Sequence, residues 1–252
     1  MHSATRAVAL ACVLGLVAPV ASEAAAWSKS CDKVNGTDRV IALQAIQNLM
    51  GRYAHLGQLR GESTIGELFA LKTEGVAWRT SAGGPTGREA MNKRYLKPGE
   101  PAPALPAGQL HTHSMLTPVI EIAGDGKTAK GVWDSYQPGM DNPNSPGSIA
   151  WVKYGVDFIK EDGTWKIWHM QLYPMFSTSW DKPVTTYVKE QRAAAEARAA
   201  QGGATPPARK LPEGWTVPKD MWRYDGLTPP RGPKIPEPYC TFDPADSYVQ
   251  VE

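Results

Sequence analysis

Histidines are the side chains of this sequence best suited to acid–base chemistry. The chain has five histidines, and His55, His111, His113 and His169 follow residue 26. An imidazole titrates near neutral pH, so it can accept or donate a proton during a reaction. His111 and His113 lie two positions apart in a segment of strand character, so they share one face with Met115. Such a pair lines a polar pocket, binds a metal or faces solvent.

His169 belongs to a second segment of strand character. The alternate positions of this segment are Trp165, Ile167, His169, Gln171 and Tyr173. The apolar pair at its start indicates an interior face, and we expect His169 to point inward with them. The opposite face carries Lys166, Trp168, Met170 and Leu172. Because this second face is not clearly polar, the sheet needs cover on both sides, from the C-terminal tail or from a second copy of the chain.

Tyr53 and Asp134 are further candidates. Tyr53 lies seven positions after Ile46 on an expected helix, so it falls on the apolar stripe and points inward, whereas His55 lies about half a turn away and faces solvent. Tyr53 is either a core residue with a satisfied hydroxyl or a hydrogen-bond donor to a developing oxyanion. Asp134 lies on a strand, on the face opposite Trp133. A carboxylate there could orient an imidazole.

Helical periodicity predicts the elements of the N-terminal half. Apolar residues recur at spacings of three and four over residues 38–59, with Thr37 or Asp38 as the N-cap. Shorter elements follow, namely helices over residues 63–71 and 86–96 and a strand over 75–79.

The character changes to strand further along the chain. Four strands are expected over residues 110–123, 128–137, 149–160 and 164–173. Gly124-Asp125-Gly126 and Asp162-Gly163 are hairpin turn signals, and a proline-containing loop over 138–147 separates the two hairpins. Three helices followed by an antiparallel meander form an α+β plan, in which a curved sheet wraps around the helices.

This order of elements resembles the SnoaL-like branch of the nuclear-transport-factor-2-like superfamily. The matching segments are Ile46-Gln-Asn-Leu-Met-Gly-Arg-Tyr53, Gly87-Arg-Glu-Ala90 and Glu161-Asp-Gly-Thr-Trp-Lys-Ile167. The resemblance implies an α+β cone-shaped barrel, made of a curved, mostly antiparallel sheet wrapped around three N-terminal helices, with an apolar pocket in its mouth. This fold hosts isomerases, dehydratases, lyases, cyclases and binding proteins, so it does not by itself fix the function.

The same resemblance implies a catalytic arrangement. SnoaL-like dehydratases commonly place a Tyr on the first helix, a His on the strand after the third helix, and an acidic or His partner on the next strand. Tyr53, His113 and Asp134 match this arrangement by element and approximate spacing, and His111 could replace His113. His169 is a further candidate base. The candidate substrate contacts are Trp133, Trp151, Lys153, Tyr154 and Tyr173.

Two of these contacts have a second interpretation. Trp133 and Trp151, together with Trp168, could wall an aromatic substrate, or they could belong to the core or to an interface. Lys153 and Asp157 share one face of their strand, with Tyr154 on the other face, and are second-line candidates for the site.

Three stretches look more loosely like bacterial γ-formaldehyde lyases that act on lignin-derived aromatic dimers. They are His111–Glu121, Lys127–Trp133 and Lys153–Phe158. This resemblance implies loss of a benzylic oxygen, a quinone-methide-like intermediate and release of formaldehyde from a neighbouring hydroxymethyl group. His113 or His169 would be the base, and Tyr53 or Asp134 would assist the leaving oxygen. The predicted function is therefore a cofactor-independent lyase that acts on a small aromatic substrate.

Two other functions stay open. A non-catalytic exported binding protein would retain an apolar ligand without turnover. A metalloenzyme would use His111, His113 and His169 as three nitrogen ligands, as catalytic zinc sites do. The spacing of these histidines is not diagnostic of a metal, so we expect no metal site.

Absent motifs and the overall charge narrow the possibilities. The chain has no GxGxxG, P-loop, GxSxG or CxxC motif, so we expect no nucleotide cofactor, serine nucleophile or dithiol centre. The net charge of +2 lacks the electrostatic footprint of a nucleic-acid-binding protein.

The first 26 residues have the features of a secretory signal peptide. Their apolar run, residues 7–20, is too short to span a bilayer and precedes small residues suited to cleavage. We expect an exported protein, periplasmic in a Gram-negative source, with no membrane association after cleavage. Cys31 and Cys240 then remain, either as one disulfide or as two free thiols.

The chain divides into a barrel domain over residues 27–179 and a C-terminal extension over 180–252. The extension begins with an Ala-rich helix over 186–201 and holds 11 of the 22 prolines. Its aromatic residues are unlike those of a disordered tail, so we expect an ordered wrap over the barrel or over a neighbouring subunit. A homo-oligomer, dimer or trimer, is the expected assembly.

Overall fold

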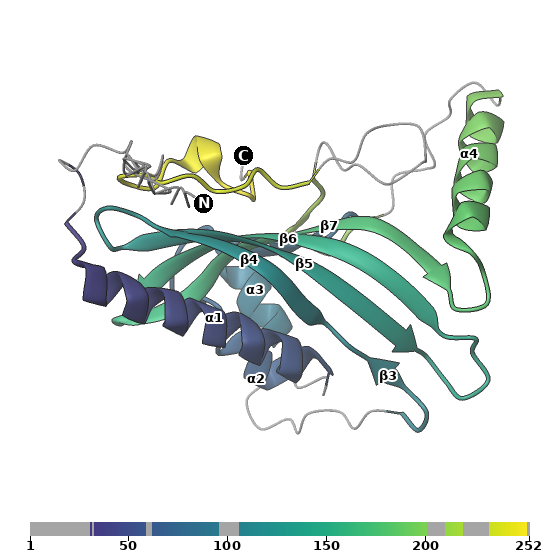
Figure 1. Ribbon diagram of the computed structural model, residues 1–252, viewed down its shortest axis with the longest axis horizontal. Helices are drawn as coiled ribbons and strands as arrows, with labels where there is room; N and C mark the ends of the chain where they lie inside the picture. The colour runs from purple at the N-terminus through teal and green to yellow at the C-terminus, as the bar shows by residue number, and fades with distance from the viewer. Residues whose placement is uncertain are drawn as a thin grey trace, which may run out of the picture.

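A curved sheet lies between helix α1 and the C-terminal part of the chain (Figure 1). The computed structural model describes residue 31 and residues 33–58, 62–95, 106–200, 210–218 and 232–250. In chain order the elements are α1 (Gly36–Gln58), α2 (Glu62–Gly66), β1 (Ala77–Arg79), β2 (Gly84–Pro85), α3 (Arg88–Tyr95), β3 (Leu110–His111), β4 (Ser114–Ile122), β5 (Thr128–Met140), β6 (Ser148–Glu161), β7 (Thr164–Ser179), α4 (Val184–Ala200), β8 (Trp215–Thr216) and a 3₁₀ helix over Pro244–Asp246.

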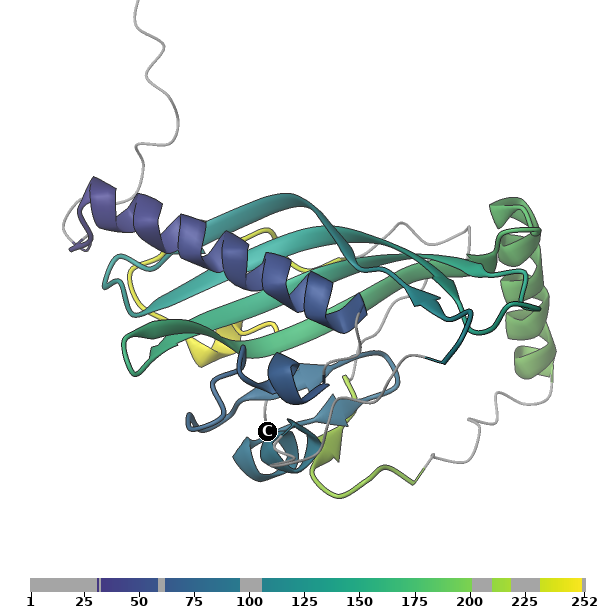
Figure 2. The ribbon, with the colours of Figure 1, turned by 90° about the horizontal axis from the view of Figure 1, so that it is seen from below.

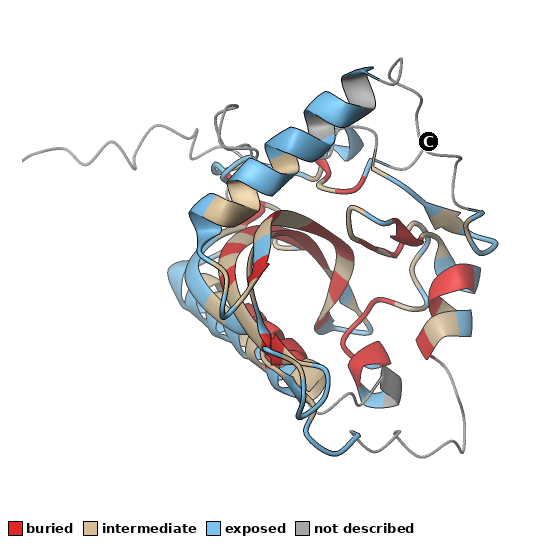
Figure 3. Cartoon of the chain, turned by 90° about the vertical axis from the view of Figure 1, so that its right-hand side faces the viewer, coloured by how far each residue is buried: buried red, intermediate tan, exposed pale blue. Residues whose placement is uncertain are grey.

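The main sheet has the strand order β1-β7-β6-β5-β3, and β4 also pairs with β5. Its pairs are antiparallel except for β1 with β7, which run parallel. The strands curl into a half-barrel around the buried residues (Figure 3). The predicted α+β cone with a mostly antiparallel sheet is confirmed. A second, two-stranded sheet of β2 and β8 was not predicted.

Helix α1 begins earlier than its apolar periodicity predicts. Asn35, rather than Thr37 or Asp38, caps it, because the Asn35 side-chain oxygen accepts a hydrogen bond from the Asp38 backbone N–H at 2.9 Å. The helix buries Ile46 and Tyr53 and exposes His55, as its periodicity predicts. It covers the concave face of the sheet (Figure 2).

The strands differ from their predicted bounds in three places. The strand predicted over 110–123 is two strands, β3 and β4, separated by Thr112 and His113. Strand β5 runs through Pro138 to Met140, into the predicted loop, and β7 extends to Ser179. The long final strands carry the sheet well beyond the end of α1 (Figure 1).

The inner face of the sheet forms the apolar core with α1. Trp133, Tyr154, Phe158 and Ile167 lie on it and pack around Ile46. Complete burial of each large apolar side chain stabilises the fold by about 1.5–3 kcal/mol. Because alternate residues of a strand point to opposite faces, Asp134, Lys153 and Asp157 lie on the outer face.

Residues 232–250, the C-terminal segment, lie across the outer face of the sheet, opposite α1 (Figures 1 and 2). The backbone N–H groups of Gly124 and Asp125 donate to the carbonyls of Tyr239 and Cys240 at 2.8 and 3.0 Å. A disulfide joins Cys240 to Cys31, with 5.4 Å between the two Cα atoms. Of the two alternatives for these cysteines, the structure has the disulfide, and residues 232–250 lie against the sheet of the same chain.

Helix α4 stands at the far end of β7, away from α1 (Figure 1), and confirms the predicted Ala-rich helix. None of the helices in the described part of the chain has the length and apolar character needed to span a bilayer. The predicted signal peptide, residues 1–26, lies outside the described residues.

Candidate functional site

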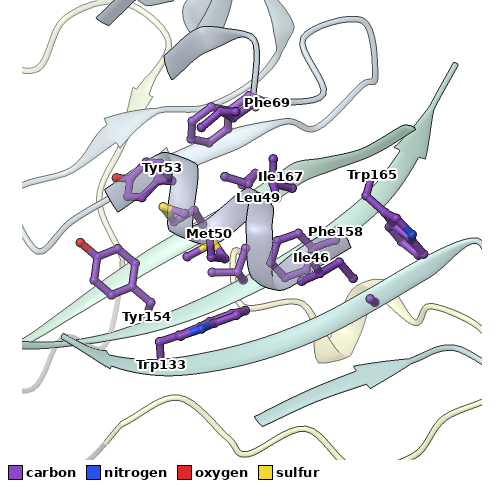
Figure 4. Close-up of a cluster of buried hydrophobic side chains, with 14 of the residues drawn as sticks. Ile46, Leu49, Met50, Tyr53, Phe69, Trp133, Tyr154, Phe158, Trp165 and Ile167 are labelled. Carbon is purple, nitrogen blue, oxygen red and sulfur yellow. The ribbon is translucent and has the colours of Figure 1, made fainter. Parts of the chain in front are cut away.

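Two tyrosines meet at one end of the buried cluster. Tyr53 of α1 and Tyr154 of β6 have ring centres 6.2 Å apart, with their planes inclined by 73°. Their hydroxyl groups point to the same end of the cluster, away from Trp165 (Figure 4). Tyr53 lies in the last turns of α1, at the end of the sheet where β3 begins, which we call the open end of the half-barrel (Figure 1).

Both tyrosine hydroxyls accept a hydrogen bond. The indole N–H of Trp78 donates to the Tyr53 oxygen at 3.0 Å. The amide nitrogen of Gln137 donates to the Tyr154 oxygen at 2.9 Å and to the Ser135 hydroxyl at 3.2 Å. Because an indole can only donate, the Tyr53 hydrogen is left to point elsewhere.

Burial keeps both tyrosines protonated. Burial is the main cause that raises the pKa of Tyr53 well above its ordinary value, and Tyr154 and Tyr95 nearby raise it further. The pKa of Tyr154 is also raised by burial, against the opposing hydrogen bonds from Gln137 and Ser135. The two hydroxyls are therefore neutral hydrogen-bond donors at neutral pH.

Arg94 places a positive charge near this end of the site. Its guanidinium lies 4.9 Å from the centre of the Trp78 ring and 5.9 Å from that of Trp215, which is cation–π geometry. Its charge acts to lower the pKa of Tyr53. Burial and the neighbouring tyrosines outweigh this effect of Arg94.

His113 lies in the break between β3 and β4. At this break Thr112 turns toward Pro138. The Pro138 carbonyl accepts a hydrogen bond from the Thr112 backbone N–H at 3.1 Å and another from the Thr112 hydroxyl at 2.9 Å. The His113 side chain packs against Gly57 of α1, where an added Cβ would lie 3.1 Å from the His113 Nδ1 atom. Gly57 is one helical turn from Tyr53, so His113 and Tyr53 lie on the same side of α1.

The His113 ring is suited to accept a proton. Its Nδ1 atom is buried and has no hydrogen-bond partner within the described residues. Burial, and then the neighbouring His111, lower the pKa of His113 below its ordinary value. The ring is therefore neutral at neutral pH and carries an unengaged nitrogen.

His111 lies nearer the end of the sheet. It pairs with Gly139 on β5, and its Nε2 atom is 3.9 Å from the Asp141 carboxylate. Because His111 and His113 are separated by the break, the continuous strand that was predicted to align them is absent.

Asp134 lies on the other side of the sheet from Tyr53. Its carboxylate accepts from Lys153 Nζ at 2.6 Å and from the Trp151 indole at 3.0 Å. Burial acts to raise the pKa of Asp134, but the Lys153 and Trp151 hydrogen bonds outweigh it, so the pKa is lowered. The structure therefore does not bring Asp134 together with Tyr53 and His113.

His169 also lies on the outer face, contrary to the prediction. The β6–β7 register pairs Phe158 with Ile167 but Asp157 with His169, because a bulge at Trp168 shifts it by one residue. Ile167 therefore points into the core, and His169 points outward. There its Nδ1 lies 3.0 Å from the Asp157 carboxylate and 3.0 Å from the Ser247 hydroxyl.

Asp157 is the centre of a buried polar cluster under the C-terminal segment. It accepts from Lys130 Nζ at 2.6 Å, from the Ser247 hydroxyl at 2.7 Å and from the Tyr248 backbone N–H at 3.1 Å. Burial raises the pKa of Asp157, but the His169 hydrogen bond and the Lys130 charge outweigh it and lower the pKa. This cluster fastens the C-terminal segment to the sheet.

The predicted substrate contacts divide between the two faces. Trp133 and Tyr154 are on the inner face, and Trp133 packs edge-on against Phe158 in the core. Trp151, Lys153 and Tyr173 are on the outer face, where burial, and then Asp157, raise the pKa of Tyr173 to about 12. Of these five contacts, only Tyr154 reaches the candidate site with its polar atom.

The three histidines of the metal alternative are not gathered. Within the part of the chain that the structure describes, no group of three or more His, Cys, Asp or Glu side chains is arranged to hold a metal ion.

Sequence reasoning missed Trp78, Gln137 and Ser135. Trp78 lies on a three-residue strand, and Gln137 and Ser135 lie on the inner face of β5, in line with Trp133. The period of two places Ser135 and Gln137 on the face of Trp133, which is the one signal that could have found them.

The family comparison agrees with this fold. The family model of the SnoaL-like domain matches residues 38–171, just over half of the chain. A scytalone dehydratase-like protein from Novosphingobium aromaticivorans is 20% identical, with a TM-score of 0.45, over 58% of this chain and 93% of its own. Hexachlorocyclohexane dehydrochlorinase LinA-type3 from Novosphingobium barchaimii is 16% identical, with a TM-score of 0.46, over 59% and 97%. None of the curated proteins matches. The chain belongs to the SnoaL-like domain family.

Proposed function

We propose that the protein is a cofactor-independent lyase that acts on a small aromatic molecule at the open end of the half-barrel. The observation that carries this proposal is the half-buried His113, whose Nδ1 atom is buried without a partner within the described residues and which packs against Gly57, one turn of α1 after Tyr53. A base with a free nitrogen and a protonated hydroxyl on the same side of α1 are the minimum machinery for an elimination.

The reaction that we propose is elimination of formaldehyde from lignin-derived diaryl compounds. His113 takes the proton of the hydroxymethyl O–H, and the C–C bond to that carbon breaks to release formaldehyde. The electron pair of this bond forms the new C=C bond, and the benzylic C–O bond breaks with its electron pair on oxygen. Tyr53 donates a hydrogen bond to the departing oxygen, and this oxygen takes up the proton that His113 removed from the hydroxymethyl group, so that no proton is gained or lost overall. No oxidant or reductant is required.

The structure changes the assignment of roles among the candidates. His169 is held by Asp157 and Ser247 on the outer face, and Asp134 is held by Lys153 there. We therefore assign the base to His113 and the assisting hydroxyl to Tyr53.

Formaldehyde release tests the proposal. The protein is incubated with a diarylpropane and with a phenylcoumaran that carry a hydroxymethyl group, and formaldehyde is measured. We expect release by the wild-type protein, loss of about 100-fold or more in His113→Gln, and no loss in the matched variant His55→Gln, whose side chain is exposed on α1.

Two outcomes would contradict the proposal. Equal rates for His113→Gln and the wild type would remove His113 from the chemistry. Tight binding of both compounds without formaldehyde or any other product would indicate a binding protein instead.

We also propose that the chain is exported to an oxidising compartment. The Cys31–Cys240 disulfide supports this, because such bonds persist in secreted and periplasmic proteins. Fractionation of the source cells, with the N-terminus of the mature protein sequenced, tests it. Recovery in the cytoplasm with an intact N-terminus would contradict it.

A further inference from the structure

We infer that the end of the half-barrel opposite the open end holds a second ligand site, which takes a small aromatic carboxylate. Helix α1 begins at this end, and the turn between β4 and β5 and the turn between β6 and β7 lie beside its start (Figures 1 and 2). A hollow of about 540 Å³ lies among these three segments, and we call it the N-terminal hollow. The inference goes beyond the proposed function, because none of the residues of the candidate site lines this hollow.

The N-terminal hollow has an apolar side that a ligand can reach. Ile41 and Ala45 of α1 line it, together with Ile122 of β4 and Trp165 of β7. Ile41 is 61% exposed, so this side is open to solvent, while Trp165 keeps only 8% of its surface exposed and is fixed in the core. Pockets for small molecules have volumes of about 300–1,000 Å³ and are lined mainly by such side chains. The hollow is therefore large enough for one or two aromatic rings.

Two lysines supply positive charge to the N-terminal hollow. Lys160 pairs with Trp165 across the β6–β7 hairpin, and its Nζ lies 5.0 Å from the centre of the indole ring. Lys33 lines the hollow from the segment before α1. Neither ammonium group is paired with a carboxylate of the described residues. An anionic group on the ligand would supply the missing partner.

The two carboxylates that also line the hollow are already engaged. Asp38 accepts from the Asn35 side-chain amide at 2.7 Å, and Asp125 accepts from the Lys127 backbone N–H at 3.0 Å. Each is held within its own turn. The charged groups left to bind a ligand are therefore the two ammonium groups, beside an apolar side that holds an indole. This combination fits a ring that carries a carboxylate.

The walls of the N-terminal hollow are held in place before a ligand binds. The Lys33 backbone N–H donates to the Gly124 carbonyl at 2.7 Å, and the Cys31–Cys240 disulfide ties the segment before α1 to the C-terminal segment. Gly126 has φ 71°, and an added Cβ there would lie 2.9 Å from the Val34 Cγ2 atom, so this turn packs closely against the same segment. A preformed site spends little binding free energy on ordering.

Binding of 2-naphthoate tests the inference. The comparison ligand is 2-naphthamide, which has the same rings and shape but no charge, and dissociation constants are measured by titration calorimetry. We expect the wild-type protein to bind the naphthoate at least about 10-fold more tightly than the amide, which is the effect of hydrogen bonds to a charged group.

Backbone amide resonances locate the bound naphthoate. Gly126 and Gly163 lie in the two turns that line the N-terminal hollow, and their resonances should shift during the titration. Gly57 packs against His113 near the open end, and its resonance should stay in place.

The variants separate the two lysines from the rest of the surface. Lys160→Gln and Lys33→Gln should each weaken naphthoate binding about 3- to 10-fold and leave binding of the amide unchanged. The double variant should bind both ligands equally. Lys189→Gln, an exposed position on α4 at the other end of the molecule (Figure 1), is the matched control and should change neither affinity.

Three results would overturn the inference. They are equal affinity for the two ligands in the wild-type protein, a preference for naphthoate that survives in the double variant, and shifts at Gly57 in place of Gly126 and Gly163. None of these measurements involves formaldehyde release, so the proposed lyase activity stands or falls separately.

Discussion

The His113 ring occupies the space beside Gly57 that a side chain at position 57 would need. An added Cβ at position 57 would lie 3.1 Å from the His113 Nδ1 atom and 3.6 Å from its Cε1 atom. Gly57 is the penultimate residue of α1, and a side chain there would crowd the histidine ring. Gly51 lies in the same helix and has nothing within 4 Å of its Cβ position.

This contact predicts opposite effects for two similar substitutions. Gly57→Ala should displace the His113 ring and lower turnover by about 10-fold or more, because small misplacements of catalytic groups are costly. Gly51→Ala should leave turnover unchanged and raise the free energy of unfolding by about 0.5–1 kcal/mol. Steady-state kinetics and urea denaturation of both variants check the prediction. Equal turnover in the two variants would show that His113 does not depend on the gap.

The lowered pKa of His113 predicts the shape of the pH profile. Burial and His111 lower this pKa, so the base form persists into mildly acidic solution, and kcat/KM should fall only as the pH drops below about 6.5. Stability follows the same sign. The unfolded chain binds this proton more readily than the folded protein, so the free energy of unfolding falls as the pH drops through the same window. In His113→Gln this part of the stability change should disappear, and its persistence would assign it to other groups.

The cluster under the C-terminal segment predicts a large loss of stability. Asp157→Asn leaves the Lys130 ammonium buried without its counter-ion, which costs about 3–5 kcal/mol. Asp134→Asn removes a partner from the more exposed Lys153 and should cost no more than about 1 kcal/mol. Urea denaturation measures both, and similar losses would mean that the Asp157 cluster is not the stronger fastening.

Acid should weaken the same fastening. The pKa of Asp157 is lowered in the folded protein, so its contribution is present above the ordinary aspartate pKa, about 4, and is lost as the pH falls through the lowered value. Proteolysis of the C-terminal segment at a series of acidic pH values reads out its release. Cleavage that does not change with pH would contradict this.

The disulfide predicts a stability that depends on redox conditions. It closes a loop with a sequence separation of 209, for which the chain-entropy model gives about 5 kcal/mol of stability. Cys31→Ser should therefore lower the free energy of unfolding by about that amount, and a reductant should do the same to the wild-type protein. A reductant should not destabilise Cys31→Ser further, and any further loss would point to a different cause.

The alternation along β7 predicts the inner face correctly up to Ile167. The bulge at Trp168 then adds one residue to the strand. Alternation places Trp165 and Ile167 inside, and they are buried in the core. The bulge at Trp168 then exchanges the faces, so His169 points outward. A period of two cannot reveal a bulge, because no residue type marks it, and every position after it is assigned to the wrong face.

The sequence predicts only part of the candidate site, because periodicity gives the face of a residue but not its partners. Tyr53 follows from helical periodicity, which is reliable over a long helix. Periodicity places Gln137 on the inner face, but it does not show that Gln137 contacts Tyr154 or that Trp78 contacts Tyr53. Asp134 matched by element alone, and the element does not settle the face.

The link between Cys31 and Cys240 has a mechanical consequence. It makes residues 31–240 a covalent ring that contains α1 and every strand of the sheet. If the two ends of the chain are pulled apart, the tension peels away Ser247 and Tyr248 and then runs through the sulfur–sulfur bond. The half-barrel with Tyr53 and His113 carries none of that load until the bond is reduced.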